Sequence, residues 1–268
     1  MSNVEIRQDF SEIDCCETLG ESMYHKLDSE HCTNDIDHTK PVNKQFLEEL
    51  LESNALKGKV MCVEGNIATG KTTLISALLY DLNLCQVNVK VLEEQIDQTL
   101  LEKFNSDPKK YGLELQDSMM RKRIQAMKTA QEYKKTDHFV IMDTGFIREK
   151  AFTLANYKQK NLTQSEFIEH EKVFLDLHKE IGMPVPDCII ILDCSPQRCK
   201  VNINIRNRVN ERELSITYLD ELRKAHKQVL TEFSSSNPKV SIINADVSDQ
   251  YTTSSFVWKN LYQNFVTH

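Results

Sequence analysis

Two glycines separated by four residues, then a lysine and a threonine, form the stretch of this chain with the clearest chemistry. Residues 60–73 read V-M-C-V-E-G-N-I-A-T-G-K-T-T, and the helical spacing of Leu74, Leu78 and Leu79 follows. The pattern G-x-x-x-x-G-K-T between a strand and a helix wraps backbone N–H groups around phosphate oxygens. The stretch therefore predicts a site for a nucleoside triphosphate.

The residues of this loop are expected to share the binding of ATP and Mg²⁺. Lys71 would reach the β and γ phosphates, and the Thr72 hydroxyl would ligate the magnesium ion. We assign to nucleotide binding Gly65, Asn66, Ile67, Ala68, Thr69, Gly70, Lys71, Thr72 and Thr73. A glycine turn without a ligand is the alternative, and the flanking strand and helix disfavour it.

Apolar runs alternate with helical patterns along the rest of the chain. Strands are expected at 60–65, 87–92, 138–143, 187–193 and 240–244. Helices are expected at 43–55, 74–84, 108–135, 149–160, 163–181, 196–208 and 215–233. Near-continuous apolar strands separated by helices predict an α/β fold with a five-stranded parallel sheet covered on both faces. Ligands of such sheets bind outside the carboxyl ends of the strands.

Carboxylates follow four of these strands. They are Glu93 and Glu94, Asp143, Asp193, and Asp246. One such residue is often a loop residue or a helix cap, but four that converge on a phosphate loop favour a catalytic site. Asp143 also opens an Asp-Thr-Gly triplet, the signature of aspartic proteases, and its surroundings lack the β-rich context of that class.

Composition bounds the class of protein. The 268 residues include 33 basic and 40 acidic side chains without a basic block, so we expect no nucleic-acid partner. No apolar run is long enough to span a bilayer, and the N-terminus resembles neither a signal nor a transit peptide. We expect a soluble, cytoplasmic protein without a membrane partner.

The first forty residues differ in character from the rest. Residues 1–40 are polar and acidic, which predicts a disordered N-terminal extension before a single domain at 41–268. A metal site is an alternative interpretation of this stretch, because Cys15, Cys16 and Cys32 lie near His25, His31 and His38. Their spacing matches no zinc pattern.

Several segments resemble the cellular deoxynucleoside kinases. Residues 60–79 are similar to that family's phosphate loop, E-G-N-I-x-S-G-K-T-T, and 100–116 resembles a stretch that ends in a glutamine. P-D-C-I-I-I-L-D-C-S-P at 186–196, R-N-R at 206–208 and Y-L-D-E-L at 218–222 resemble its fourth strand, arginine lid and following helix. The resemblance implies a P-loop kinase fold with an arginine-containing lid, and a homodimer.

The resemblance also implies an activity, the transfer of the γ-phosphoryl group of ATP to the 5′-hydroxyl of a deoxynucleoside for nucleotide salvage. Glu94 would accept the hydroxyl proton, with Glu93 as the competing residue. Asp143 would hold the magnesium shell, and Gln116 would pair with the base.

The remaining implied roles concern the donor side and the lid. Arg206 and Arg208 would close over the transferring group, where they act with Lys71. Asp246 and Val247 fall where the family's adenine-contacting loop follows the last strand.

The sequence departs from the family around the nucleoside. Thr144 stands where the family has an arginine, and Arg148 or Arg212 is expected to fill that place. Gln95 replaces a proline. Thr99 and Asn105 occupy two positions where aromatic residues frame the nucleoside, and Asn210 or Glu211 would hold the 3′-hydroxyl.

Two other functions stay open at this point. A nucleoside-monophosphate kinase of thymidylate-kinase type shares the sheet but grips an acceptor phosphate with added arginines, and Thr144 removes the usual one. A degenerate kinase fold that binds ATP as a scaffold is the second alternative; Lys71, Thr72, Glu94 and Asp143 argue against it.

Overall fold

A five-stranded parallel sheet organises the protein. The computed structural model describes residues 45–182, 185–246 and 250–267, and the sheet has the strand order β2-β3-β1-β4-β5. Its strands are β1 (Val60–Gly65), β2 (Val89–Leu92), β3 (Phe139–Asp143), β4 (Cys188–Asp193) and β5 (Ser241–Asp246). All pairings are parallel, as predicted, so the carboxyl ends of all five strands lie at one edge.

Both faces of the sheet are buried, which explains the apolar character of its strands. Met61 and Val63 of β1 join one hydrophobic cluster, and Val60 and Cys62 join the other. Successive side chains of a strand point to opposite faces, so a two-sided core requires apolar residues at nearly every position.

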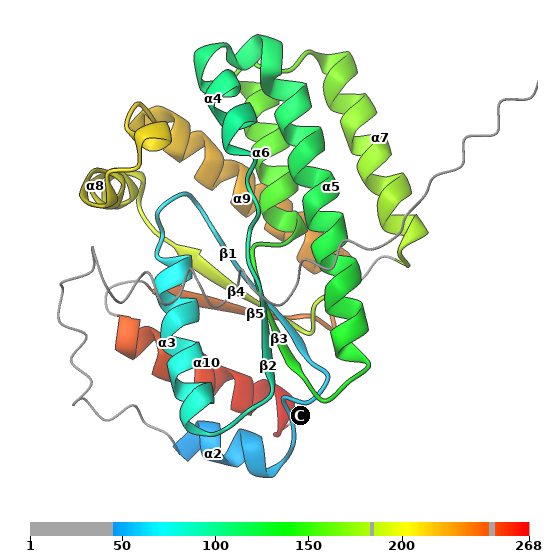
Figure 1. The fold of residues 1–268 in the computed structure, drawn as a ribbon, viewed down its shortest axis with the longest axis vertical. Coiled ribbons are helices and arrows are strands. Elements are labelled where there is room, and N and C mark those ends of the chain that lie inside the picture. Colours follow the sequence, from blue (N-terminus) through cyan, green and yellow to red (C-terminus); the bar gives the residue numbers. More distant parts are fainter. Residues whose placement is uncertain (1–44, 183–184, 247–249, 268) are drawn as a thin grey trace, which may run out of the picture. The chain divides into compact units, whose positions relative to one another are not determined.

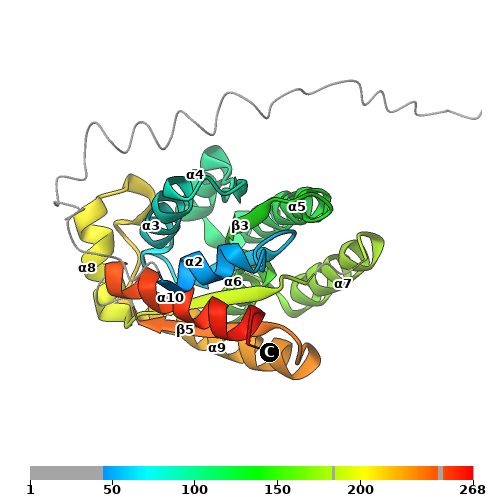
Figure 2. The ribbon, with the colours of Figure 1, turned by 90° about the horizontal axis from the view of Figure 1, so that it is seen from below.

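Two layers of helices cover the sheet. The helices are α2 (Gln45–Glu52), α3 (Lys71–Leu84), α4 (Gln98–Ser106), α5 (Pro108–Lys134), α6 (Phe146–Lys158), α7 (Gln164–Glu180), α8 (Pro196–Arg206), α9 (Ile216–Ser236) and α10 (Gln250–Phe265), with the short 3₁₀ helix η1 (Val209–Glu211). Figure 1 shows α2, α3 and α10 on one side of the sheet and α5, α6, α7 and α9 on the other. Figure 2 shows α2 and α10 side by side.

Side-chain caps fix where several helices begin. Asp97, Asp107 and Thr163 each accept a hydrogen bond from a backbone N–H in the first turn of α4, α5 and α7, and Ser195 and Ser215 do so for α8 and α9. Such a cap satisfies N–H groups that have no partner within the helix. The starts of these helices, which carry side chains of the site, are therefore encoded locally.

The sequence prediction missed two helices and began two others too late; α3 starts at Lys71 rather than at residue 74. α4 was not predicted although its nine residues gather their apolar side chains on one face, and α10 was not predicted because its first turns are rich in Thr and Ser. α6 begins at Phe146 rather than at residue 149. Arg148 therefore lies in the first turn of α6.

α10 is tied to the helix that follows the phosphate loop. Trp258 is fully buried, and its indole Nε1 donates a 2.8 Å hydrogen bond to Asp81 Oδ2 of α3. A buried indole N–H needs such a partner. The C-terminal helix thus belongs to the core.

Some predictions fall outside the described residues. They are the N-terminal extension 1–40 and its Cys and His residues. Within the described ranges, no helix combines the length and the apolar character needed to cross a membrane.

Candidate active site

The phosphate loop lies between β1 and α3, as its sequence predicts. Gly65 has φ 150°, and a Cβ there would lie 2.7 Å from the Leu192 carbonyl oxygen. Gly70, directly before α3, has φ 93° in the left-handed region. Glycine is the residue that accepts both constraints, a close backbone approach and a positive φ. The loop can therefore turn tightly at the N-terminus of α3 and leave its amides for an anion.

Lys71 lies in the first turn of α3 with its side chain over the loop. Its Nζ donates hydrogen bonds of 2.8 Å to the Asn66 carbonyl and 3.3 Å to the Gly65 carbonyl. Burial and the nearby Arg148 guanidinium lower the pKa of Lys71 to about 7, although Asp143, Glu94 and Glu64 oppose the shift. The negative charge of a triphosphate would restore the cation.

Glu94 lies just beyond β2, between two arginines. Its Oε1 accepts a 2.6 Å hydrogen bond from Arg123 Nη2, and its Oε2 lies 3.5 Å from Arg148 Nη1. Burial alone would raise the pKa of this carboxyl, but Arg148, Arg123 and Lys71 hold it at about 2. Among the described residues no salt bridge includes the competing Glu93, and burial raises its pKa. Glu94 is therefore a fixed carboxylate.

Arg148 reaches this carboxylate from the start of α6. It is 8% exposed, its guanidinium carbon lies 4.8 Å from the centre of the Phe152 ring, and its Nε has no hydrogen-bond partner. Four residues earlier, Thr144 is buried at φ 76°, and its hydroxyl also lacks a partner. A β-branched residue in the left-handed region is strained. The chain thus places a guanidinium beside Glu94 without an arginine at position 144.

Asp143 and Thr72 offer oxygen atoms suited to Mg²⁺. Burial raises the pKa of Asp143, while Lys71, Arg148 and a hydrogen bond from Thr72 oppose the shift. Its Oδ1 is buried without a hydrogen-bond partner, as a metal ligand would be before binding. Carboxylate and hydroxyl oxygens are the donors that magnesium prefers. No cluster of three or more His, Cys, Asp or Glu side chains in the described part could hold a metal alone, so phosphates would complete the shell.

Glu64, at the end of β1, is a member of the site that our sequence reasoning missed. Its Oε1 accepts a 2.9 Å hydrogen bond from the Gly145 amide, and its Oε2 is buried without a partner. Burial raises the pKa of Glu64 to about 7, against the effect of Arg123 and Arg148. Glu64 and Glu94 share the same arginines, yet their pKa values are pushed apart, a pattern typical of active sites.

Gln116 lies on α5, on the buried side that faces α6. The facing, buried sides of α5 and α6 form what we call the inner wall. Gln116 is 2% exposed, and its Oε1 accepts a 3.4 Å hydrogen bond from the Thr153 hydroxyl. Arg123, two helical turns later, donates from Nη1 to Glu149 and from Nη2 to Glu94. The prediction overlooked Arg123 and Glu149. Seven residues separate Gln116 from Arg123, which places both on one helix face, and this spacing was the available signal.

The predicted lid, Arg206-Asn207-Arg208, runs from the last residue of α8 to the residue before η1. Arg206 Nε donates a 2.6 Å hydrogen bond to Glu211, and Arg208 lies 3.9 Å from the same carboxylate. Asn105 of α4 donates a 3.0 Å hydrogen bond to the Asn210 carbonyl. Glu211 therefore pairs with both lid arginines. Asn105 lies on an exposed face of α4 and links that helix to the residues that follow the lid.

The remaining expected positions lie apart from this cluster or outside the description. Arg212 contacts Lys200 of the lid through its carbonyl oxygen, which Lys200 Nζ approaches to 2.7 Å. Asp246 ends β5 at the edge where the other carboxylates gather. Val247 lies outside the described residues.

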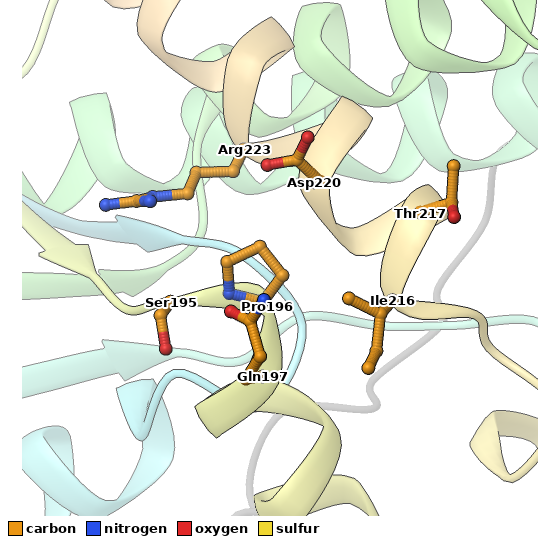
Figure 3. A pocket seen from close by; sticks show the side chains of 7 residues that line it. All are labelled: Ser195, Pro196, Gln197, Ile216, Thr217, Asp220 and Arg223. Carbon is orange, nitrogen blue, oxygen red and sulfur yellow. The ribbon is translucent and has the colours of Figure 1, made fainter.

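A separate cavity of about 450 Å³ lies where α8 and α9 begin. It is lined by Ser195, Pro196, Gln197, Ile216, Thr217, Asp220 and Arg223. Figure 3 shows the Pro196 ring facing Asp220 and Ile216 across this hollow. No phosphate-loop residue lines it. We place the active site at the phosphate loop, where the carboxylates and arginines converge.

The chain resembles known kinases over most of its length. The family model "Deoxynucleoside kinase" matches residues 61–267. A deoxyadenosine kinase of Dictyostelium discoideum is 30% identical over 204 residues, 76% of this chain and 80% of the relative. A deoxyguanosine kinase of the same organism is 29% identical over 187 residues, 69% of this chain and 63% of the relative. The structure of a deoxyadenosine kinase from M. mycoides with bound dATP covers 76% of this chain and 98% of its own, with a TM-score of 0.62 at 18% identity, which supports the fold.

Proposed function

Because the chain belongs to the deoxynucleoside kinase family, we propose that it transfers the γ-phosphoryl group of ATP to the 5′-hydroxyl of a deoxynucleoside, with Glu94 as the base. The observation that carries the proposal is the position of Glu94. A largely buried carboxylate lies just beyond a strand end, between Arg123 and Arg148 and near the charge of Lys71. An acceptor hydroxyl and a donor phosphate can meet there.

Glu94 would accept the proton of the 5′-hydroxyl as the phosphoryl group is transferred. A carboxyl with a pKa of about 2 is ionised at neutral pH but is a weak base. A bound triphosphate would partly neutralise Lys71 and Arg148, which hold that pKa down, and so raise it toward a more useful value. Bound ATP would thus make Glu94 a stronger base.

Lys71, Arg148 and the lid would stabilise charge on the transferring group. Phosphoryl transfer spreads negative charge over the equatorial oxygens, so positioned cations supply most of the catalysis. Lys71 approaches from the phosphate loop and Arg148 from α6. Arg206 and Arg208 would approach from the lid, where Glu211 holds them and could accept a hydrogen bond from the sugar 3′-hydroxyl.

Thr72 and Asp143 would hold Mg²⁺. The ion would supply positive charge to the β and γ phosphates of ATP when bound. The unpartnered Asp143 Oδ1 supports this assignment.

The inner wall would receive the nucleoside. Gln116 carries a donor and an acceptor suited to the edge of a base, and its near-complete burial supports this role. Asn105 lies farther out on α4, near the lid, where it would border the sugar side of the site. Asp246 and Val247 would lie near the adenine of ATP.

An acceptor phosphate fits this site poorly, which disfavours a monophosphate kinase. The Glu94 carboxylate would repel a dianionic acceptor phosphate, and Arg123 and Arg148, the guanidiniums beside it, are already paired with carboxylates. We also place the protein in nucleotide salvage in the cytoplasm, as a homodimer that binds neither nucleic acid nor a membrane.

The experiment is ADP release in the presence of Mg²⁺, with each deoxynucleoside and each monophosphate offered in turn. We expect turnover with at least one deoxynucleoside and none with monophosphates. Lys71→Met is the matched control, and it should lower turnover by about 10²–10³-fold. Turnover only with monophosphates would support the monophosphate kinase. ATP binding without any turnover would support the scaffold.

A further inference from the structure

Behind Gln116 lies a row of polar side chains that the proposed mechanism does not use. We propose that this row, from Asp117 through His170 and Thr153, fixes the orientation of the Gln116 amide and so selects between two classes of nucleobase. The inference rests on the proposed function, because it takes Gln116 as the partner of the base.

The row is continuous from the surface to the inner wall. His170 Nδ1 lies 2.8 Å from Asp117 Oδ1, and its Nε2 lies 3.1 Å from the Thr153 hydroxyl oxygen. That oxygen lies 3.4 Å from Gln116 Oε1. His170, Thr153 and Gln116 are at most 2% exposed, whereas the Asp117 side chain is 40% exposed. Three members of the row are therefore shielded from water, which would otherwise compete for their hydrogen bonds.

The Thr153 hydroxyl has a single proton, so it can donate a hydrogen bond either to His170 Nε2 or to Gln116 Oε1, but not to both. If His170 Nε2 carries no proton, it accepts the hydroxyl proton, and Gln116 Oε1 receives nothing. If Nε2 is protonated, it donates to the hydroxyl oxygen, and the hydroxyl proton is free to turn toward Gln116. The Glu149 carbonyl, 3.1 Å away, and Glu149 Oε1, 3.5 Å away, compete for the same proton.

The surroundings of His170 favour the protonated form. The charged groups that face the ring are Asp117 from α5 and Glu149 from α6, whose Oε1 lies 3.4 Å from Nε2. Arg123 lies on the far side of Glu149 and contacts its other oxygen. Burial opposes the charge, but the hydrogen bonds that the ring donates to the two carboxylates outweigh it and raise the pKa of His170.

The orientation of an amide decides which base edge it matches. Adenine and cytosine present a ring-nitrogen acceptor beside an amino donor, whereas guanine and thymine present a ring N–H donor beside an oxo acceptor. A half-turn of the Gln116 amide exchanges one match for the other. A Thr153 hydroxyl that donates to Oε1 holds the amide in one of these two states.

The test compares base discrimination in variants of the row. For each protein, kcat/KM is measured for deoxyadenosine against deoxyguanosine and for deoxycytidine against thymidine. Thr153→Val keeps the side-chain shape but removes the hydroxyl. We therefore expect each of the two ratios to move toward one by about five- to tenfold, the worth of one hydrogen bond. Thr153→Ser restores the hydroxyl and should restore the ratios.

Histidine provides a matched control on the same helix. His178 lies two turns after His170 and is also buried, but its ring packs on Phe146 and Phe174 and contacts no carboxylate among the described residues. His170→Phe should shrink the ratios as Thr153→Val does. His178→Phe should leave them unchanged.

The pH dependence of the ratios separates this role from a purely structural one. The wild-type ratios should fall as the pH rises through the pKa of His170, which lies above the usual value for a histidine. Asp117→Asn removes an exposed carboxylate without disturbing the core and should move this fall to lower pH. His170→Phe should show no fall.

The outcomes distinguish the two proposals. A wild-type protein that phosphorylates none of the four deoxynucleosides would overturn the proposed function and this inference with it. An active wild-type protein whose Thr153→Val, His170→Phe and Asp117→Asn variants all keep its ratios and their pH dependence would overturn the row alone.

Discussion

At the scale of single residues, the site places two carboxylates near the same two guanidiniums. Glu64 and Glu94 face the same arginines, yet the pKa of one is about 7 and that of the other about 2. Arg123 contacts Glu94, whereas Glu64 receives only the Gly145 amide. The carboxylate with the direct guanidinium contact stays ionised, and this difference guides the first prediction.

Glu94→Gln should lower turnover by about 10²–10⁴-fold, because the amide keeps the shape of the side chain but cannot accept a proton. ATP affinity should persist. Glu93→Gln is the control, since Glu93 has no ion pair among the described residues. Steady-state kinetics with the best deoxynucleoside and a nucleotide-binding measurement check both. Full activity of Glu94→Gln would refute its role as the base.

Arg148→Ala should lower kcat by about 10²–10³-fold, because it removes a positioned cation beside Glu94. Thr144→Arg should also lower turnover, since position 144 is buried and a second guanidinium would compete with Arg148. Kinetics and thermal melts of both variants check this. An active Arg148→Ala, or a Thr144→Arg with raised turnover, would show that Arg148 does not replace the missing arginine.

At the scale of elements, the lid is held from two sides. Glu211 of η1 gathers Arg206 and Arg208, and Asn105 of α4 reaches over to η1. α4 is therefore more than a connection between β2 and α5. It supplies a contact that can keep the lid over the site.

Asn105→Ala should raise the KM for ATP about fivefold, the effect of losing one hydrogen bond to the lid, and should leave the melting temperature nearly unchanged. Ser106→Ala is the matched control, because the Ser106 hydroxyl bonds within its own turn to the Lys103 carbonyl. Equal KM values for the wild type and both variants would mean that the Asn105 hydrogen bond does not hold the lid.

Much of the element pattern could be predicted from the sequence, for identifiable reasons. Gly65, Gly70 and Lys71 predicted the phosphate loop, and unbroken apolar runs predicted the buried strands. α10 was not predicted, because its core contacts, such as that of Trp258 with Asp81, join segments 177 residues apart. Arg123 and Glu149 escaped for the same reason, since each lies within a helix and only packing of α5 against α6 brings them together.

At the scale of the whole molecule, an N-terminal stretch of different composition precedes the residues 61–267 that match the kinase family. Deleting residues 1–40 should change the melting temperature little and leave turnover largely intact, because a polar, acidic stretch has few side chains that could pack into a core. Thermal melts and the ADP-release assay of the truncated chain check this. A truncated protein that fails to fold, or that loses bound zinc, would contradict it.

The contact between Trp258 and Asp81 gives the protein a built-in optical reporter. The chain contains one tryptophan, and its indole is buried against α3, the helix whose first residue is Lys71. All intrinsic tryptophan fluorescence therefore originates at the junction between the C-terminal helix and the phosphate-loop helix. Unfolding of this junction exposes the indole to water and shifts its emission to longer wavelength, so nucleotide-dependent stabilisation can be followed without a label.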